Sequence, residues 1–140
     1  MSAKSVVKHV LAAEGVETNE VTIYFVTSSE ISRLHADFFR DPSPTDCISF
    51  PIDGGHPTQG GYHVLGEVFV CPHTALQYLK TQSEETDPYQ ETTLYLVHGL
   101  LHLIGYNDIE DTDRRKMRVA ENKHLSNLFS QNLLLKPSSK

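Results

Sequence analysis

The sequence is short of cysteine, of long apolar runs and of basic charge, and each shortage argues against a class of protein. It has two cysteines in 140 residues, Cys47 and Cys71, which lie far apart and form no CxxC pair. We expect reduced thiols, as in a cytoplasmic protein, rather than a disulfide framework or a cysteine zinc site. No apolar run reaches the roughly 18 residues of a membrane span, and the N-terminal segment does not have the pattern of a signal peptide.

The shortage of basic charge bears on nucleic-acid binding. Twelve Lys and Arg stand against 18 Asp and Glu, which gives a formal net charge of −6 at pH 7. This argues against broad electrostatic binding of nucleic acid, but a local basic groove remains compatible with it. One dense basic run, RRKMR at 114–118, falls in the first turns of an expected helix. Cations oppose the helix dipole there, so we hypothesise contact with RNA or the ribosome; a solvated helix face is the alternative.

The pattern of apolar residues predicts the fold class. Residues 1–135 are expected to form a single metal-dependent hydrolase domain, with 136–140 as a frayed C-terminal tail. The expected strands cover 21–26, 47–52 and 64–71. The expected helices are an N-terminal one that ends at Gly15, then 28–39, 72–82, about 87–104, and one that begins near 111. This order predicts an α+β fold, with a small mixed sheet packed with several helices.

The stretch HGLLHLIGYND at 98–108 carries the strongest chemical signal. His98 and His102 are four residues apart, so a helix directs both rings to one point. Alone, this pair is equally consistent with two partly buried, hydrogen-bonded imidazoles. Gly105 lets the chain leave the helix in a conformation that other residues resist, so that Asp108 can return to the same point. The spacing H-x3-H-x2-G-x2-D predicts that His98, His102 and Asp108 bind one metal ion.

Three protein ligands with a position left open for water are typical of a catalytic zinc site. The alternative role for Asp108 is to cap the following helix or to belong to a solvated acidic stretch. An aspartate in place of a third neutral imidazole lowers the charge of the site by one and can relax its selectivity toward harder divalent ions. We therefore expect one zinc ion per chain, on a central helix and the turn after it, with another divalent metal as the alternative.

A glutamate is missing where a zinc peptidase needs one. The peptidase motif places its general base directly after the first histidine, and this chain has Gly99 at that position. Glycine cannot transfer a proton. The peptidase interpretation would therefore need Glu67 or another carboxylate to act from a different segment.

Three segments resemble the YbeY family, the bacterial endoribonucleases of ribosomal RNA maturation. HGLLHLIGYND is similar to the family signature HGxLHLxGYDH, FFRDPSPTDCISFP (38–51) to YRxxDxPTDVLSFP, and LGEVFV (65–70) to LGDIVI. The segments occur in the family's order, and the similarity covers residues 20 to 130 approximately. The chain departs from the pattern at Asp108, where the family has histidine, and at Asn107 and Glu67, where it has aspartate.

The resemblance implies a fold and a reaction. It implies an α+β fold with zinc held by the residues that match His98, His102 and Asp108, and a catalytic arginine that Arg40 matches. From the residues alone, Arg40 would form a surface salt bridge to Asp37 or Asp41. The implied reaction is metal-assisted cleavage of single-stranded RNA by a cytoplasmic enzyme. Its implied roles are maturation of the 3′ end of 16S rRNA and ribosome quality control, with the ribosome or its small-subunit proteins as partners and no membrane.

Two other functions remain open at this point. One is a zinc hydrolase of a peptide or amide, which the glycine at position 99 disfavours. The other is a non-enzymatic ribosome-assembly factor whose metal only stabilises the fold.

Overall fold

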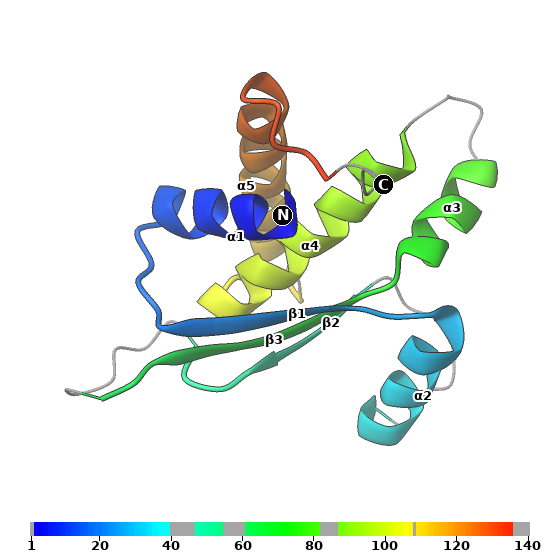
Figure 1. Ribbon diagram of the computed structural model, residues 1–140, viewed down its shortest axis with the longest axis horizontal. Helices are drawn as coiled ribbons and strands as arrows, with labels where there is room; N and C mark the ends of the chain where they lie inside the picture. The colour runs from blue at the N-terminus through cyan, green and yellow to red at the C-terminus, as the bar shows by residue number, and fades with distance from the viewer. Residues whose placement is uncertain (1, 40–46, 55–60, 82–86, 108, 136–140) are drawn as a thin grey trace.

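The structure is a computed structural model, and it describes residues 2–39, 47–54, 61–81, 87–107 and 109–135 (Figure 1). The helices and strands follow the order expected from the sequence. Arg40, Asp108 and the tail 136–140 lie outside the described residues. The elements are α1 (Ser2–Ala13), β1 (Glu20–Phe25), α2 (Ser28–Phe39), β2 (Cys47–Pro51), β3 (Val64–Val70), α3 (Pro72–Lys80), α4 (Pro88–Ile104) and α5 (Asp111–Ser130).

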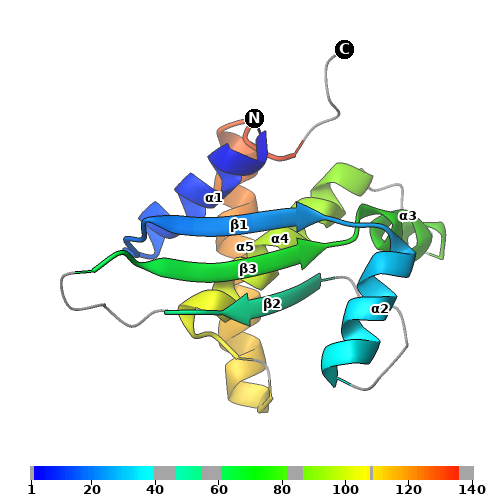
Figure 2. The ribbon, with the colours of Figure 1, turned by 60° about the horizontal axis from the view of Figure 1, so that its bottom comes forward.

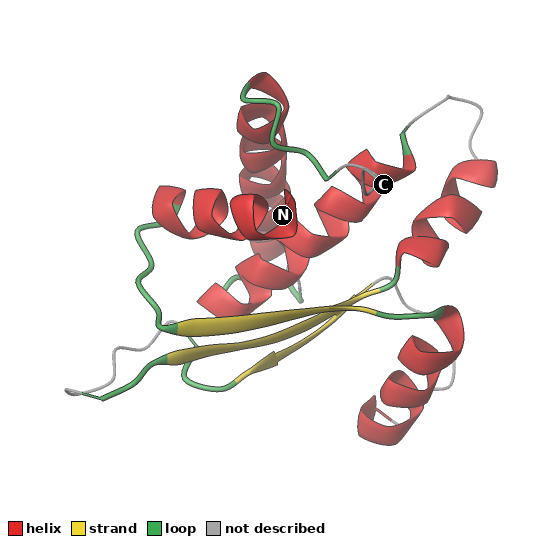
Figure 3. Cartoon of the chain, viewed as in Figure 1, coloured by secondary structure: helices red, strands yellow, loops and turns green. Residues whose placement is uncertain are grey.

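The three strands form one mixed sheet in the order β1-β3-β2. β1 runs parallel to β3, whereas β2 pairs with β3 in the antiparallel direction. Figures 1 and 2 show α1, α4 and α5 on one face of the sheet and α2 on the other face, at one end. The same separation of helices and strands is visible in Figure 3. The expected α+β fold with a small mixed sheet is therefore confirmed.

Helix α4 lies at the centre of the core and begins and ends at the expected residues. Asp87 caps its first turn by accepting a hydrogen bond from the Tyr89 N–H at 2.9 Å, and Pro88 occupies the first helical position. Most of its side chains are buried because the sheet covers one side and helices α1, α3 and α5 pack on the others. Its fully buried members include Leu96, Leu100 and Leu101. A helix apolar on nearly all sides is typical of such a central position.

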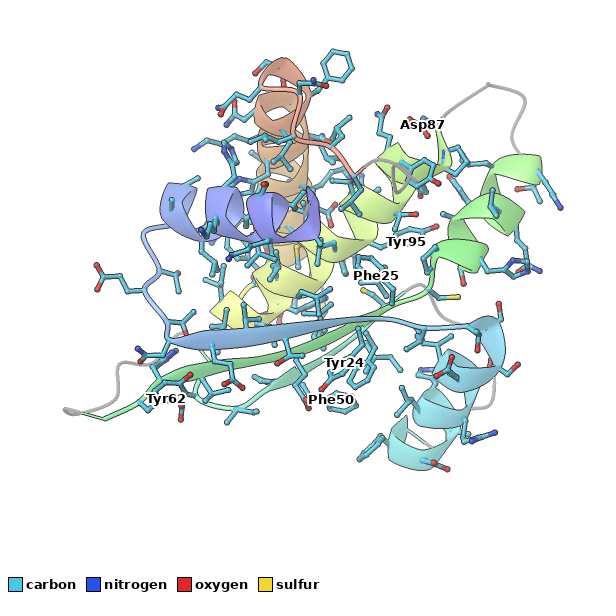
Figure 4. The ribbon with its side chains drawn as sticks, in the orientation of Figure 1. Tyr24, Phe25, Phe50, Tyr62, Asp87 and Tyr95 are labelled. Atoms are coloured by element: carbon cyan, nitrogen blue, oxygen red, sulfur yellow. The ribbon has the colours of Figure 1, made fainter. Side chains whose placement is uncertain are left out.

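The other face of the sheet carries aromatic side chains and the carboxylate of Glu67. Tyr24 stacks on Phe69 with ring centroids 4.6 Å apart, and Phe50 meets Phe69 edge-on at 5.7 Å. Figure 4 shows Tyr24 and Phe50 on the side opposite α1 and α4. Glu67 belongs to this face as well, because the Tyr24 hydroxyl donates to it at 3.3 Å. The charge of the Glu67 carboxylate raises the pKa of Tyr24.

The structure also bears on the cysteines and on membrane-spanning helices. Cys47 and Cys71 form no disulfide. Among the described residues, no helix combines the length and the hydropathy that a membrane crossing requires.

Gly66 allows β2, β3 and α4 to approach closely, and this gives a test of the packing. Its φ is +153°, and an added Cβ would lie 2.5 Å from the Phe50 carbonyl oxygen and 2.8 Å from Leu103 Cδ2. We predict that Gly66→Ala lowers the free energy of unfolding by about 1–3 kcal/mol, because the strained backbone and the clash add together. Urea denaturation followed by circular dichroism measures the change.

Gly61→Ala is the matched control, since an added Cβ at Gly61 meets nothing within 4 Å. The control should leave the urea midpoint nearly unchanged. Equal midpoints for Gly66→Ala and the wild type would contradict the close approach.

Candidate metal centre

His98 and His102 lie one turn apart near the C-terminal end of α4, and the structure brings their rings together as expected. Their Nε2 atoms are 2.9 Å apart. The ring centroids are 4.5 Å apart and the ring planes are inclined at 81°. Both side chains are half-buried, with 26% of the His98 side chain exposed. The two histidines therefore share one point at the boundary between core and solvent.

The partners of the Nδ1 atoms determine which ring nitrogens carry protons. His102 Nδ1 lies 3.1 Å from the carbonyl oxygen of Tyr106, and His98 Nδ1 is hydrogen-bonded to the carboxylate of Glu121. A carbonyl oxygen and an ionised carboxylate can only accept, so we assign the ring proton to Nδ1 in both histidines. Each neutral ring then presents the lone pair of its Nε2 atom to the other.

Two nitrogen lone pairs at this separation repel each other unless a proton or a cation lies between them. Imidazole nitrogens oriented by a hydrogen bond from Nδ1 are the usual protein ligands of zinc. The donor set of His98 and His102 therefore fits a divalent cation held by both Nε2 atoms.

The third predicted ligand, Asp108, and the predicted catalytic Arg40 lie outside the described residues. Before Asp108, α4 ends at Gly105 as the sequence predicts. Gly105 has a φ of +124° and ends α4, with its N–H hydrogen-bonded to the carbonyls of Leu101 and His102. Among the described residues, no group of three His, Cys, Asp or Glu side chains could hold a metal ion. Ligation by Asp108 and catalysis by Arg40 stay predictions.

The packing around Gly99 leaves no room for the glutamate that a zinc peptidase carries at this position. An added Cβ at Gly99 would lie 2.6 Å from Val68 Cγ1 and 3.1 Å from Ser49 Oγ. The position after His98 therefore faces the sheet, away from the paired Nε2 atoms, and it has no room for a side chain. The Ser49 hydroxyl donates to the Gly99 carbonyl at 3.0 Å, which ties β2 to α4 at this point.

Glu67 does not replace the missing general base. It lies on the sheet face that carries Tyr24, whereas α4 packs on the opposite face. Glu67 therefore does not face the histidines, and the peptidase interpretation would need another carboxylate.

A partly buried polar network ties the turn after α4 to the residue that follows α1 and to helix α5. The Tyr106 hydroxyl donates to Glu14 Oε1 at 2.8 Å, and the Glu14 Oε2 atom accepts from His124 Nε2 at 2.6 Å. His124 is fully buried. The hydrogen bond to Glu14 raises the pKa of Tyr106 above its ordinary value of 10.0, so the phenol keeps its proton at neutral pH. Tyr106, whose carbonyl orients His102, is thus held in place by Glu14, and Glu14 in turn is held by His124 of α5.

The contacts of Glu121, Tyr106, Glu14 and His124 were not anticipated from the sequence. His124 belongs to the buried stripe of α5, together with Met117, Ala120 and Leu128. Glu121 follows Met117 by four residues and so lies on that same stripe. A carboxylate on a stripe that faces the core needs a partner there, and this was the one sequence signal that could have indicated the contact of Glu121.

The chain matches the model of one protein family, described as "Endoribonuclease YbeY", over residues 1–129. It is 50% identical over 132 residues to the Endoribonuclease YbeY of Protochlamydia amoebophila, a match that covers 94% of this chain and 85% of that protein. The Endoribonuclease YbeY of Chlamydia caviae is 42% identical over 135 residues, covering 96% and 85%. The family resemblance of the three sequence motifs is therefore confirmed.

A solved structure supports the fold. The solution structure of a protein from Thermotoga maritima superposes with a TM-score of 0.63 at 22% sequence identity, and the match covers 99% of this chain and 89% of that one. At this identity the likeness concerns the fold alone.

The buried network around Tyr106 gives a prediction on stability. Tyr106→Phe removes the hydroxyl that donates to the largely buried Glu14 carboxylate, so we predict a loss of about 1–2 kcal/mol in the free energy of unfolding. Tyr62→Phe is the matched control: its hydroxyl also donates to a carboxylate, Glu20 at 3.2 Å, but this pair is exposed. Chemical denaturation of both variants should show a loss for Tyr106→Phe alone, and equal losses would contradict the role of the network.

Proposed function

The chain belongs to the YbeY family of endoribonucleases, and from this premise we propose that it cleaves single-stranded RNA with the help of one bound divalent metal ion. The observation that carries the metal part of the proposal is the pair of Nε2 lone pairs that converge 2.9 Å apart on α4. The proposed substrate is 16S rRNA near its 3′ end, in maturation and in ribosome quality control. The proposed partners are the ribosome or its small-subunit proteins, and the proposed location is the cytoplasm.

The proposed ligands are His98, His102 and Asp108, and the proposed metal is zinc. When bound, a divalent cation supplies Lewis-acid stabilisation of phosphate charge and makes a nearby water more acidic. The carboxylate of Asp108 would add an oxygen to the two nitrogens, which also suits other divalent metals. Arg40 would hold the charge of the scissile phosphate through its guanidinium N–H groups.

The packing of α4 disfavours the peptidase alternative. A peptide hydrolase of this motif needs a carboxylate directly after His98, and the contact of Gly99 with Val68 leaves no space for one. Phosphodiester cleavage does not require a base at that position, because metal, guanidinium and substrate orientation can supply most of the stabilisation.

Part of the basic run 114–118 supports a local site for RNA phosphates on this acidic chain. Arg114 is occupied locally, since it donates to the Ile109 carbonyl at 2.8 Å and pairs with Asp111 at the start of α5. Arg115 instead lines a groove of about 440 Å³ formed by α5 and by residues that follow α1 and α4. The groove is lined by Glu14, Tyr106, Arg115, Lys116, Val119, Ala120 and Lys123. Its three cations, Arg115, Lys116 and Lys123, suit a phosphate backbone, and the Glu14 carboxylate in the same groove is already bonded to Tyr106 and His124.

Cleavage of a defined RNA tests the proposed function. We predict that the protein with one equivalent of zinc cuts a single-stranded oligonucleotide that spans the 3′ end of 16S rRNA. His98→Ala and His102→Ala should each reduce the rate on the order of 100-fold or more, since the metal contributes several kcal/mol to the transition state. Single-turnover assays on gels measure the rates, with casein as the competing substrate.

His73→Ala is the matched control, because His73 is exposed at the start of α3. It should cleave RNA at the wild-type rate. Cleavage of casein rather than RNA would contradict the proposal in favour of a peptidase. A wild-type protein that binds zinc and gains thermal stability but cuts no RNA would favour the non-enzymatic assembly factor.

A further inference from the structure

Glu121 reaches the metal centre from a different helix. It lies on α5, 23 residues after His98, and its Oε2 atom accepts a hydrogen bond from His98 Nδ1. Only 14% of its side chain is exposed. The burial of Met117 and Leu128 on the same side of α5 holds this side of the helix against α4. A carboxylate in such a place loses hydration, so the contact with His98 has to compensate for that loss.

The contact determines what His98 can bind. A neutral imidazole carries one ring proton, which can occupy either nitrogen, and only the other nitrogen can bind a metal. Because a carboxylate accepts and does not donate, Glu121 keeps the proton on Nδ1. The lone pair of His98 Nε2 is then directed toward His102 Nε2, 2.9 Å away.

The two histidines are held by acceptors of unequal strength. His102 Nδ1 donates to a neutral carbonyl, that of Tyr106, at 3.1 Å. His98 donates to an ionised carboxylate, and charge-assisted hydrogen bonds are about twice as strong as neutral ones. The carboxylate also places negative charge next to the point where a cation would bind. The loss of Glu121 should therefore affect His98 first and leave the ring of His102 in place.

We propose that Glu121 is a positioning residue of the metal centre, which fixes the proton and the orientation of His98 so that its Nε2 atom can bind the metal. The inference depends on the proposed metal site and names a residue outside its predicted ligands.

Zinc affinity, measured by competition with a chromophoric chelator, tests the proposal without any nuclease assay. Glu121→Ala should weaken zinc binding by about 10- to 100-fold, the usual cost of losing such a partner. Glu121→Gln should lose less, because its amide oxygen can still accept from Nδ1 although the charge is gone. Glu110→Gln is the matched control, since Glu110 is an exposed carboxylate at the start of α5 that makes no side-chain capping bond.

The protonated nitrogen of His98 can be observed directly by ¹⁵N NMR of the metal-free protein. The wild type and Glu121→Gln should show the proton on Nδ1 of His98, and Glu121→Ala should show it shared with Nε2 or moved there. His102 should keep its proton on Nδ1 in all three proteins. A purely structural role for Glu121 would not change this signal while the fold is intact.

The outcomes separate this inference from the proposed function. If the wild type binds zinc through His98 and Glu121→Ala binds it equally tightly, the positioning role is wrong and the metal site stands. If His98→Ala binds zinc as tightly as the wild type, the proposed site itself is wrong. Should Glu121→Ala fail to fold, Glu121→Gln and the NMR assignment decide: an unprotonated Nδ1 of His98 in the wild type would overturn the proposal.

Discussion

Two hydrogen bonds from Nδ1 atoms hold the imidazoles of α4, and the rest of the site depends on them. One ends on the Tyr106 carbonyl in the turn after α4, and the other on the Glu121 carboxylate in α5. Together they direct the Nε2 atoms of His98 and His102 toward each other. Since Tyr106 is itself bonded to Glu14, the turn after α1 contributes as well. The site is therefore a product of tertiary packing, although both of its histidines come from one helix.

One side of α4 packs against the sheet, and another side carries the two histidines. The side that carries Gly99 meets Val68 so closely that no side chain fits between helix and sheet. The histidines lie on another side, where α5 and the turn supply acceptors. Polar groups in such a place cost free energy unless they are partnered, and a satisfied network makes their positions rigid. We expect that rigidity to serve metal binding, because ligands held in place lose little entropy when the ion arrives.

Much of the fold could be predicted from the sequence because its signals are local. Asp87, Pro88 and Gly105 mark the ends of α4 by capping and backbone conformation, and the strand boundaries differ from the expected ones by at most one residue. The central position of β3 and the partners of the histidines could not be predicted. Glu14 and His124 are 110 positions apart, and no local pattern encodes such a contact. Motif spacing placed the two rings correctly, while Asp108 and Arg40 depend on spacing and family likeness alone.

X-ray absorption at the zinc edge tests most directly whether both histidines bind one ion. Protein loaded with one equivalent of zinc should show two imidazoles at about 2.0–2.1 Å, with oxygen ligands at about 2.0–2.2 Å, and no sulfur. His98→Ala should reduce the imidazole contribution to one ring. A wild-type spectrum with a single imidazole, or one that His98→Ala leaves unchanged, would contradict the account.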